Sequence, residues 1–238
     1  MPTALRAEAR AARGSGWRAV EAQHRNATLA LVRGDLAGQA LLEDILDEAK
    51  PRLPDDAAGL HFLLATPFRY LPPPPHGSRF RGRFDAAVFY GAEEIRTACA
   101  EAGYWRLRFW LDSAGLSGKP AAMPMTLFEF HYAATALIDL TAAPFKAKRK
   151  AWTRPDDYNA TQALANRARS EGIDLIRAES VRDGPHGRCL AILTPAAFKA
   201  VAQPFRNHQQ TWSLYLQPPG LAVWSHNLDG EQHRFEFA

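Results

Sequence analysis

The chain has 238 residues, of which 47% are hydrophobic and 23% are charged, a composition typical of a globular domain and not of a disordered or fibrous chain. Its 29 Lys and Arg against 25 Asp and Glu give a net charge of +4, too small an excess to require a polyanionic partner. Only two cysteines occur, which excludes a disulfide-stapled secreted domain. No apolar run reaches the ~18 residues that a bilayer span needs, and both observations favour a cytoplasmic protein.

The first part of the chain is predicted to be largely helical. Residues 1–16 are rich in Ala and Arg and close with Gly-Ser-Gly, which predicts a flexible arm or a short helix before a single domain over 17–238. Asp35 is placed to cap a helix that ends at Pro51, because proline cannot continue a helix. The run 71–77 holds four consecutive prolines and predicts an exposed, stiff loop.

The rest of the chain mixes strands with short helices. Segments rich in aromatic or β-branched residues predict strands at 85–90, 106–111, 126–132, 136–140, 174–178, 188–193, 212–216, 221–226 and 233–237. A helix is predicted at 93–102, and a second at 159–171, opened by the pair Asn159 and Gln162 and ended by Gly172. Thr194-Pro195 predicts the start of another helix. The pattern indicates a mixed α/β fold.

An arginine, a tyrosine and a lone carboxylate are spaced along the middle of the chain. Tyr90 and Glu101 stand eleven positions apart, Arg79 precedes them in Gly-Ser-Arg-Phe-Arg, and Ser180 follows in Glu-Ser-Val-Arg-Asp. This arrangement resembles the RES family, named for conserved Arg, Glu and Ser, which comprises NAD-degrading toxins of bacterial toxin–antitoxin pairs. The resemblance covers roughly 60–200. It implies a compact α/β (α+β) domain of mixed sheets and flanking helices, similar to ADP-ribosyltransferases, with NAD in a cleft between two small sheets.

The resemblance also implies roles for single residues. Breaking the nicotinamide–ribose bond passes through an oxocarbenium-like transition state, which Glu101 would stabilise. Arg79 would grip the pyrophosphate, Tyr90 would wall the pocket, and Ser180 would donate hydrogen bonds. The implied substrate-binding residues are Arg69, Tyr70 and Arg81, of which Arg69-Tyr70 matches an upstream Arg-Tyr pair and Arg81 competes with Arg79 for the pyrophosphate.

Each of these residues has a plain structural reading as well. By composition alone, Glu101 is a solvated charge near a helix end, Tyr90 is a core residue and Ser180 is an ordinary turn residue. Ser180 has no histidine beside it, which argues against a nucleophile. The basic run 146–150 is more typical of a solvated loop than of a nucleic-acid site, and the His and Cys spacing predicts no metal site.

The resemblance therefore implies an NAD phosphorylase or NAD glycohydrolase that passes ADP-ribose to phosphate or water, with NAD as a substrate and no cofactor. Two alternatives remain open: a protein ADP-ribosyltransferase, and a non-catalytic module that binds a phosphate ligand or nucleic acid. The implied partner is a cognate Xre-like, DNA-binding antitoxin, through which oligomers would form. Inorganic phosphate is a possible second substrate, and neither a membrane nor direct contact with nucleic acid is expected.

Overall fold

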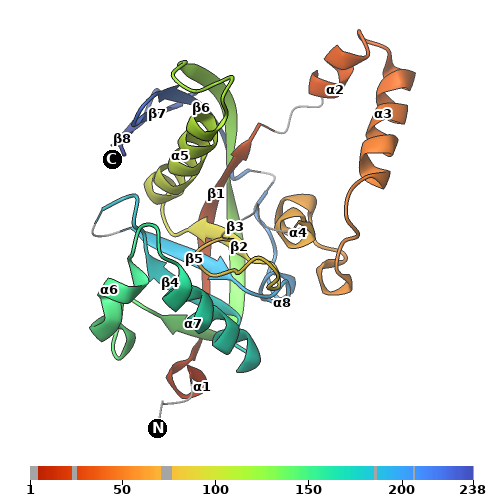
Figure 1. Cartoon of the computed structure of the whole chain (residues 1–238). Coiled ribbons are helices and arrows are strands. Elements are labelled where there is room, and N and C mark those ends of the chain that lie inside the picture. The colour runs from red at the N-terminus through yellow and green to blue at the C-terminus, as the bar shows by residue number, and fades with distance from the viewer. Residues whose placement is uncertain (1–4, 23–25, 71–76, 185–186, 206, 238) are drawn as a thin grey trace.

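The computed structural model describes residues 5–22, 26–70, 77–184, 187–205 and 207–237, and it confirms the mixed α/β fold (Figure 1). Eight strands of the described chain form one sheet. Their bounds are β1 Arg10–Glu21, β2 Phe89–Ala92, β3 Ala121–Asp139, β4 Leu175–Glu179, β5 Arg188–Ile192, β6 Gln209–Gln217, β7 Leu221–His226 and β8 Gln232–Glu236.

The long strand β3 organises the sheet. The strand order is β1-β2-β5-β4-β3-β6-β7-β8, and β1 also pairs with β3, so that β1, β2, β5, β4 and β3 close into a ring. The other edge of β3 is shared: its residues 137–139 pair in parallel with β4, and its residues 121–128 pair with β6. The two small sheets that the resemblance implied are therefore two branches of one sheet, joined at β3.

Helices flank both branches. Their bounds are α1 Leu5–Glu8, α2 Asn26–Leu31, α3 Leu36–Glu48, α4 Phe62–Arg69, α5 Ile95–Asp112, α6 Arg149–Trp152, α7 Asn159–Ser170 and α8 Ala196–Lys199, with 3₁₀ turns at Asp55–Ala57 and Phe145–Lys148. In the α7 branch, Leu164 and Ala168 pack with Ile176 of β4. In the α5 branch, Leu107 packs with Trp212 and Trp224 of β6 and β7.

The N-terminal segment corrects the prediction of a flexible arm over 1–16. From Arg10 on, the chain is strand β1, which pairs antiparallel with β3 as far as Glu21. The backbone of β1 passes so close to its neighbours that a Cβ added at Gly16 would lie 2.7 Å from the Phe130 ring and 2.8 Å from the carbonyl oxygen of Ala92. The small residues that suggested a loose arm are those that a crowded strand requires, and its partner lies more than a hundred positions away.

Helix α5 corrects a second prediction. The helix predicted at 93–102 continues to Asp112, so the strand predicted at 106–111 is wrong. Cys99, Gly103 and Leu107 recur every four residues and are all buried. This helical periodicity outweighs the β-propensity of the aromatic residues in 106–111, because packing on the sheet decides the conformation.

Helix α7 forms as predicted, but its first turn is capped differently. Asp157, and not Asn159, accepts a hydrogen bond at the N-terminus, from the backbone N–H of Asn159 at 3.0 Å. Gln162 donates instead to the carbonyl oxygen of Ser78 at 3.0 Å. Gly172 follows the helix at φ +67°, the left-handed conformation that the prediction required. Gln162 therefore fastens α7 to the segment that carries Arg79.

The remaining predictions agree with the structure to different degrees. Asp35 caps α3 by accepting from the backbone N–H of Ala37 at 3.0 Å, as predicted. The strand expected from residue 85 begins only at Phe89, and the two strands expected at 126–132 and 136–140 are one, β3. The strands predicted from residue 174 onward are confirmed as β4 to β8, and α8 follows Thr194-Pro195. Residues 71–76 of the proline run lie outside the described residues.

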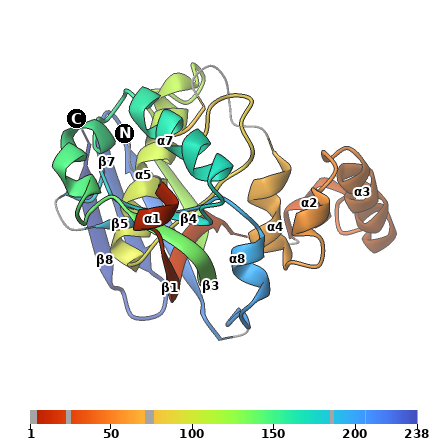
Figure 2. The same ribbon diagram turned by 90° about the horizontal axis from the view of Figure 1, so that it is seen from below.

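The pair of helices α2 and α3, called here the α2–α3 arm (residues 26–48), stands away from the sheet (Figures 1 and 2). Helix α3 contains no buried residue, and Leu36 and Leu41 are 72% and 62% exposed. In the part of the chain that the structure describes, no helix is both long and apolar enough to cross a membrane.

Candidate functional site

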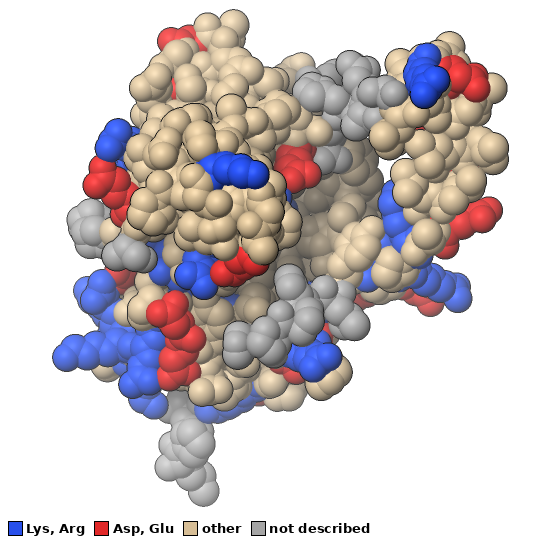
Figure 3. Space-filling model, turned by 45° about the horizontal axis from the view of Figure 1, so that its top comes forward, with Lys and Arg blue, Asp and Glu red and all other residues tan. Residues whose placement is uncertain are grey.

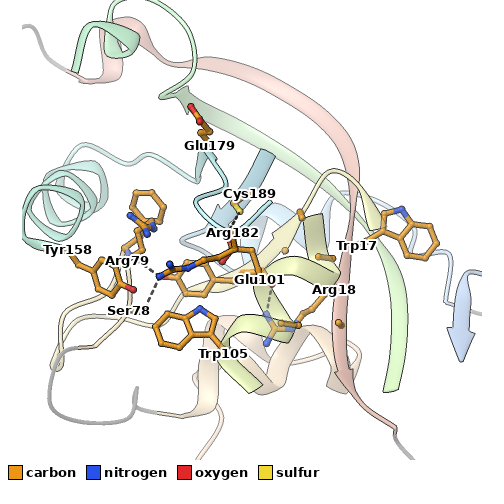
Figure 4. A pocket seen from close by; sticks show the side chains of 17 residues that line it. Trp17, Arg18, Ser78, Arg79, Glu101, Trp105, Tyr158, Glu179, Arg182 and Cys189 are labelled. Carbon is orange, nitrogen blue, oxygen red and sulfur yellow. Dashed lines mark hydrogen bonds between the residues drawn. The ribbon is translucent and has the colours of Figure 1, made fainter. Parts of the chain in front are cut away.

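A cavity of about 290 Å³ lies between α5, β1, β2 and the residues that precede α7. Residues that lie far apart in the sequence line it, including Arg18, Ser78, Arg79, Tyr90, Glu101, Trp105, Tyr158, Arg182 and Cys189. In Figure 4 most of their labelled side chains gather in one group, whereas Trp17 and Glu179 stand apart from it. The cavity therefore collects three arginines, one central carboxylate and several aromatic rings.

Glu101 lies on α5 with one carboxylate oxygen held in place. Its Oε1 accepts hydrogen bonds from Ser180 Oγ at 2.6 Å and from Cys189 Sγ at 3.4 Å. Burial raises the pKa of the Cys189 thiol, and the Glu101 carboxylate raises it further, so the thiol stays protonated and donates. No residue in the described ranges bonds the second oxygen, Oε2. One oxygen is thus fixed by the protein and the other is available to a ligand.

Ser180 joins Glu101 to the turn after β4. Its side chain is 2% exposed, and its Oγ accepts from the backbone N–H groups of Arg182 and Asp183, each at 3.1 Å. With two donors pointing at its oxygen, the hydroxyl hydrogen is directed to Glu101. Ser180 itself does not line the cavity. The structure therefore places it as the residue that orients Glu101.

Tyr90 lines the cavity and anchors the segment before β2. Its hydroxyl is 2.8 Å from Ser78 Oγ and accepts from the backbone N–H of Phe80 at 3.0 Å. Burial raises the pKa of the phenol, which is therefore neutral near pH 7. Because Ser78 and Phe80 flank Arg79, Tyr90 fixes the position of that arginine.

Arg79 is held against the cavity by backbone oxygens and a ring. Its Nη1 donates to the carbonyl oxygens of Trp152 at 3.1 Å and Arg154 at 2.9 Å, and its guanidinium carbon lies 4.9 Å from the centre of the Tyr158 ring. Within the described chain, Nε and Nη2 of Arg79 bond no other residue. These two N–H groups form the planar fork that suits an oxyanion.

Arg18 is one of the residues at the cavity that the sequence analysis missed. Its Nη1 donates to the carbonyl oxygen of Tyr90, and its guanidinium lies 4.8 Å from the centre of the Phe89 ring. Burial lowers the pKa of Arg18 to about 10, and its Nε is buried without a partner among the described residues. The side chain still carries its charge near pH 7. No signal in the sequence around Arg18 marked it, because its place in the cavity follows from the pairing of β1.

Arg182, Trp105 and Tyr158 were missed too, although each lies within four positions of a residue that was noticed: Ser180, Glu101 and Asn159, respectively. Arg182 comes two positions after Ser180. Its guanidinium carbon lies 3.5 Å from the centre of the Tyr104 ring, and its Nη2 donates to the carbonyl oxygen of Pro155 at 2.9 Å. Trp105 follows Glu101 by one helical turn, which puts both on one face of α5 once the helix is known to continue.

The surface around α6 is basic. Lys146, Lys148 and Lys150 are exposed, and Figure 3 shows Lys and Arg side chains gathered over this part of the molecule. Arg149 pairs with Glu179, whose side chain lines the cavity, with an Nε to Oε2 distance of 2.6 Å. Arg149 therefore contacts one residue that lines the cavity, whereas the lysines of the run do not line it.

Three predicted substrate-binding residues do not line the cavity: Arg69, Tyr70 and Arg81. Arg81 is 7% exposed and donates to the carbonyl oxygens of Tyr70 at 2.7 Å and Asp85 at 3.1 Å. Burial lowers the pKa of Arg81. Arg81 therefore braces the loop before β2, and Arg79 is the arginine of this loop that faces the cavity.

Comparison with known proteins adds the family. A search of the curated proteins found no match. Among solved structures, the chain is similar to the crystal structure of the M. tuberculosis MbcT–MbcA toxin–antitoxin complex, with 13% identity over 90% of each chain and a TM-score of 0.45. The two structures are too different for residue roles to be carried from one to the other. The model of the RES domain matches residues 51–217, well over half of the chain, and this protein therefore belongs to the RES-domain family.

Proposed function

We propose that this protein is an NAD-degrading toxin of a bacterial toxin–antitoxin system. The proposed reaction cleaves the nicotinamide–ribose bond of NAD and passes ADP-ribose to phosphate or water. The observation that carries the proposal is the carboxylate of Glu101, fixed through Oε1 by Ser180 in a cavity that three arginines line. Membership of the RES-domain family supports it.

Glu101 would act on the ribose. As the C1′–N bond breaks, both bonding electrons leave with nicotinamide, which becomes neutral, and positive charge develops on the ribose ring. A carboxylate beside the ring stabilises that charge, and the free Oε2 can accept a hydrogen bond from a ribose hydroxyl. Phosphate or water then bonds to C1′, and water gives up its proton to solvent. The Ser180 hydroxyl holds the carboxylate in position throughout.

The arginines would bind the pyrophosphate. NAD carries two phosphate charges, and Arg18, Arg79 and Arg182 all line the cavity. A guanidinium stays protonated and donates two parallel hydrogen bonds to phosphate oxygens. Keeping Arg18 charged in a site where burial opposes the charge is characteristic of a functional site. The acceptor would be phosphate if one arginine remained free of the dinucleotide.

The proposal includes a partner. A cognate Xre-like antitoxin with a DNA-binding region would restrain the toxin by covering the mouth of the cavity. The test compares expression of the protein alone with its co-expression with the neighbouring gene. Growth should arrest when the protein is expressed alone, and growth and cellular NAD should recover on co-expression. Growth at the full rate with well-expressed protein and undiminished cellular NAD would contradict the toxin assignment.

The reaction is tested by nicotinamide release from NAD with purified protein, with and without phosphate. Release that requires phosphate identifies a phosphorylase, and release without phosphate identifies a glycohydrolase. Glu101→Gln should abolish release while the protein stays folded. Glu94→Gln is the matched control, because Glu94 is exposed at the start of the same helix and does not line the cavity. No release from folded wild-type protein in either buffer would sink the proposal in favour of a protein ADP-ribosyltransferase or a binding module.

A further inference from the structure

Trp105 presents a large apolar ring to solvent at the cavity. Its side chain lines the cavity and is 49% exposed. The ring meets Tyr104 edge-on, with 5.3 Å between the ring centres and an interplanar angle of 80°. Within the described residues, the indole N–H has no hydrogen-bond partner. About half of the Trp105 side chain is therefore open to solvent at the cavity.

Trp105 lies toward the outer end of the cavity and Glu101 toward the inner end. Glu101 is bonded to Ser180, which is 2% exposed, whereas Trp105 is half exposed one helical turn further along α5. One turn corresponds to about 5.4 Å along the helix axis. In Figure 4 the Trp105 indole lies with Glu101, Ser78 and Arg79 in the main group of side chains, unlike Trp17.

The size of the cavity limits what it can enclose. At about 290 Å³, it matches the lower end of the ~300–1,000 Å³ range of small-molecule pockets. A dinucleotide whose ribose meets Glu101 and whose pyrophosphate meets the arginines has to extend beyond the enclosed space. The base at its other end would then lie at the mouth, where Trp105 is exposed.

We propose that Trp105 stacks on the adenine base of the dinucleotide and so determines the preference for a dinucleotide over a mononucleotide. This inference rests on the proposed NAD-cleaving function and names the residue that recognises the non-reacting end of the substrate. An indole offers a broad, flat surface that binds any planar heteroaromatic ring. Binding energy gained at this remote end is the same in the ground state and the transition state, so it lowers KM and leaves kcat unchanged.

The test compares NAD with nicotinamide mononucleotide, which lacks the adenosine half. Trp105→Ala should raise the KM for NAD roughly ten- to hundredfold, the range typical of one base–aromatic stack, with kcat within about threefold of wild type. The KM for nicotinamide mononucleotide should not rise in parallel. Trp105→Phe should recover most of the lost affinity. Phe109→Ala is the matched control, because Phe109 is 56% exposed on the same helix but does not line the cavity.

Binding measured in the Glu101→Gln background separates this inference from the proposed function. Calorimetry should show that Trp105→Ala raises the Kd for NAD by the same factor as the KM. The Kd for nicotinamide mononucleotide should stay within about threefold of its value without the Trp105 substitution. Equal weakening of both ligands, or of neither, would overturn the stacking inference while the cleavage reaction stood. Wild-type protein that neither binds nor cleaves NAD would remove both the proposed function and this inference.

Discussion

The region around the cavity buries polar side chains, whereas the α2–α3 arm exposes apolar ones. Burial lowers the pKa of Arg18, which lines the cavity, and of Arg81 in the loop behind it, and Ser180, which holds Glu101, is 2% exposed; each of these polar groups is placed there at a cost in desolvation. In the arm, Leu41 is 62% exposed, while Thr28 and Glu43 hydrogen-bond to each other at 3.0 Å between the helices. Buried polar groups that cost stability mark the part of the molecule where chemistry is expected.

The family match separates the same two regions. It begins at residue 51, after the end of α3, so the arm lies outside it, while Arg79, Glu101 and Ser180 lie inside. The effects of substitutions in the two regions should therefore differ. Substitutions at the cavity should lower activity, and substitutions on the arm should change neither activity nor stability strongly.

After the loss of activity expected for Glu101→Gln, the largest effect is expected at Ser180. Ser180→Ala removes the donor to Glu101 and the acceptor for two backbone N–H groups, so kcat for nicotinamide release should fall about hundredfold and the free energy of unfolding by about 1–3 kcal/mol. Steady-state kinetics and urea denaturation measure both. Ser170→Ala, an exposed serine on α7, should change neither. A variant that kept full activity would show that Glu101 needs no orienting hydroxyl.

Arg18 should separate activity from stability. Arg18→Met replaces a desolvated cation with an apolar chain of similar length, so activity should fall at least tenfold while the free energy of unfolding stays the same or rises by about 1 kcal/mol. Thermal denaturation beside the nicotinamide assay provides the comparison. A clear loss of stability would mean that the hydrogen bond from Arg18 to the Tyr90 carbonyl outweighs the cost of burial.

Gly91 should reveal how tightly β2 is packed beneath Tyr90. A Cβ at this position would lie 2.4 Å from the Phe130 ring, so Gly91→Ala should lower the free energy of unfolding by about 1–3 kcal/mol. Gly115→Ala is the control, because a Cβ there meets nothing within 4 Å, and its effect should stay within about 0.5 kcal/mol. Similar stability of the two variants would contradict the packing described for β2.

The smallest effect is expected on the arm. Leu41→Gln and Ile45→Gln change side chains that are 62% and 54% exposed, so the free energy of unfolding should move by no more than about 0.5 kcal/mol and nicotinamide release should be unchanged. A loss of more than 1 kcal/mol in chemical denaturation would show that the arm packs against the body of the protein, and the contrast with the cavity would weaken.

The sequence predicted those parts of the fold whose pattern is local. Alternation of buried and exposed residues marks β6, where Trp212, Leu214 and Leu216 face the core, and Gly172 marks the end of α7. Strand β1 escaped prediction because its Gly, Ala and Arg residues have low β-propensity and its conformation depends on β3. The predicted helix ended before the true end of α5 because the aromatic residues in its second half are also common in strands.

The candidate site divides in the same way. Arg79, Tyr90 and Glu101 could be identified because their spacing matches a family, and the structure brings all three to one cavity. The spacing favoured Arg79 over Arg81 but left Arg81 as a competitor, because the sequence does not show which side chain the loop turns inward. Arg18 could not be found at all, since only the closure of the sheet carries it to the carbonyl oxygen of Tyr90.

The pairing of β1 with β3 also decides where the chain can be cut. A shortened protein limited to the family match at 51–217 would lack β1 and would leave Met125–Leu137 of β3 with unpaired backbone groups along one side. An open strand edge of that length invites pairing between molecules, so such a fragment would aggregate instead of folding alone. It would also lack Arg18. A functional unit of this protein therefore has to start upstream of Arg10.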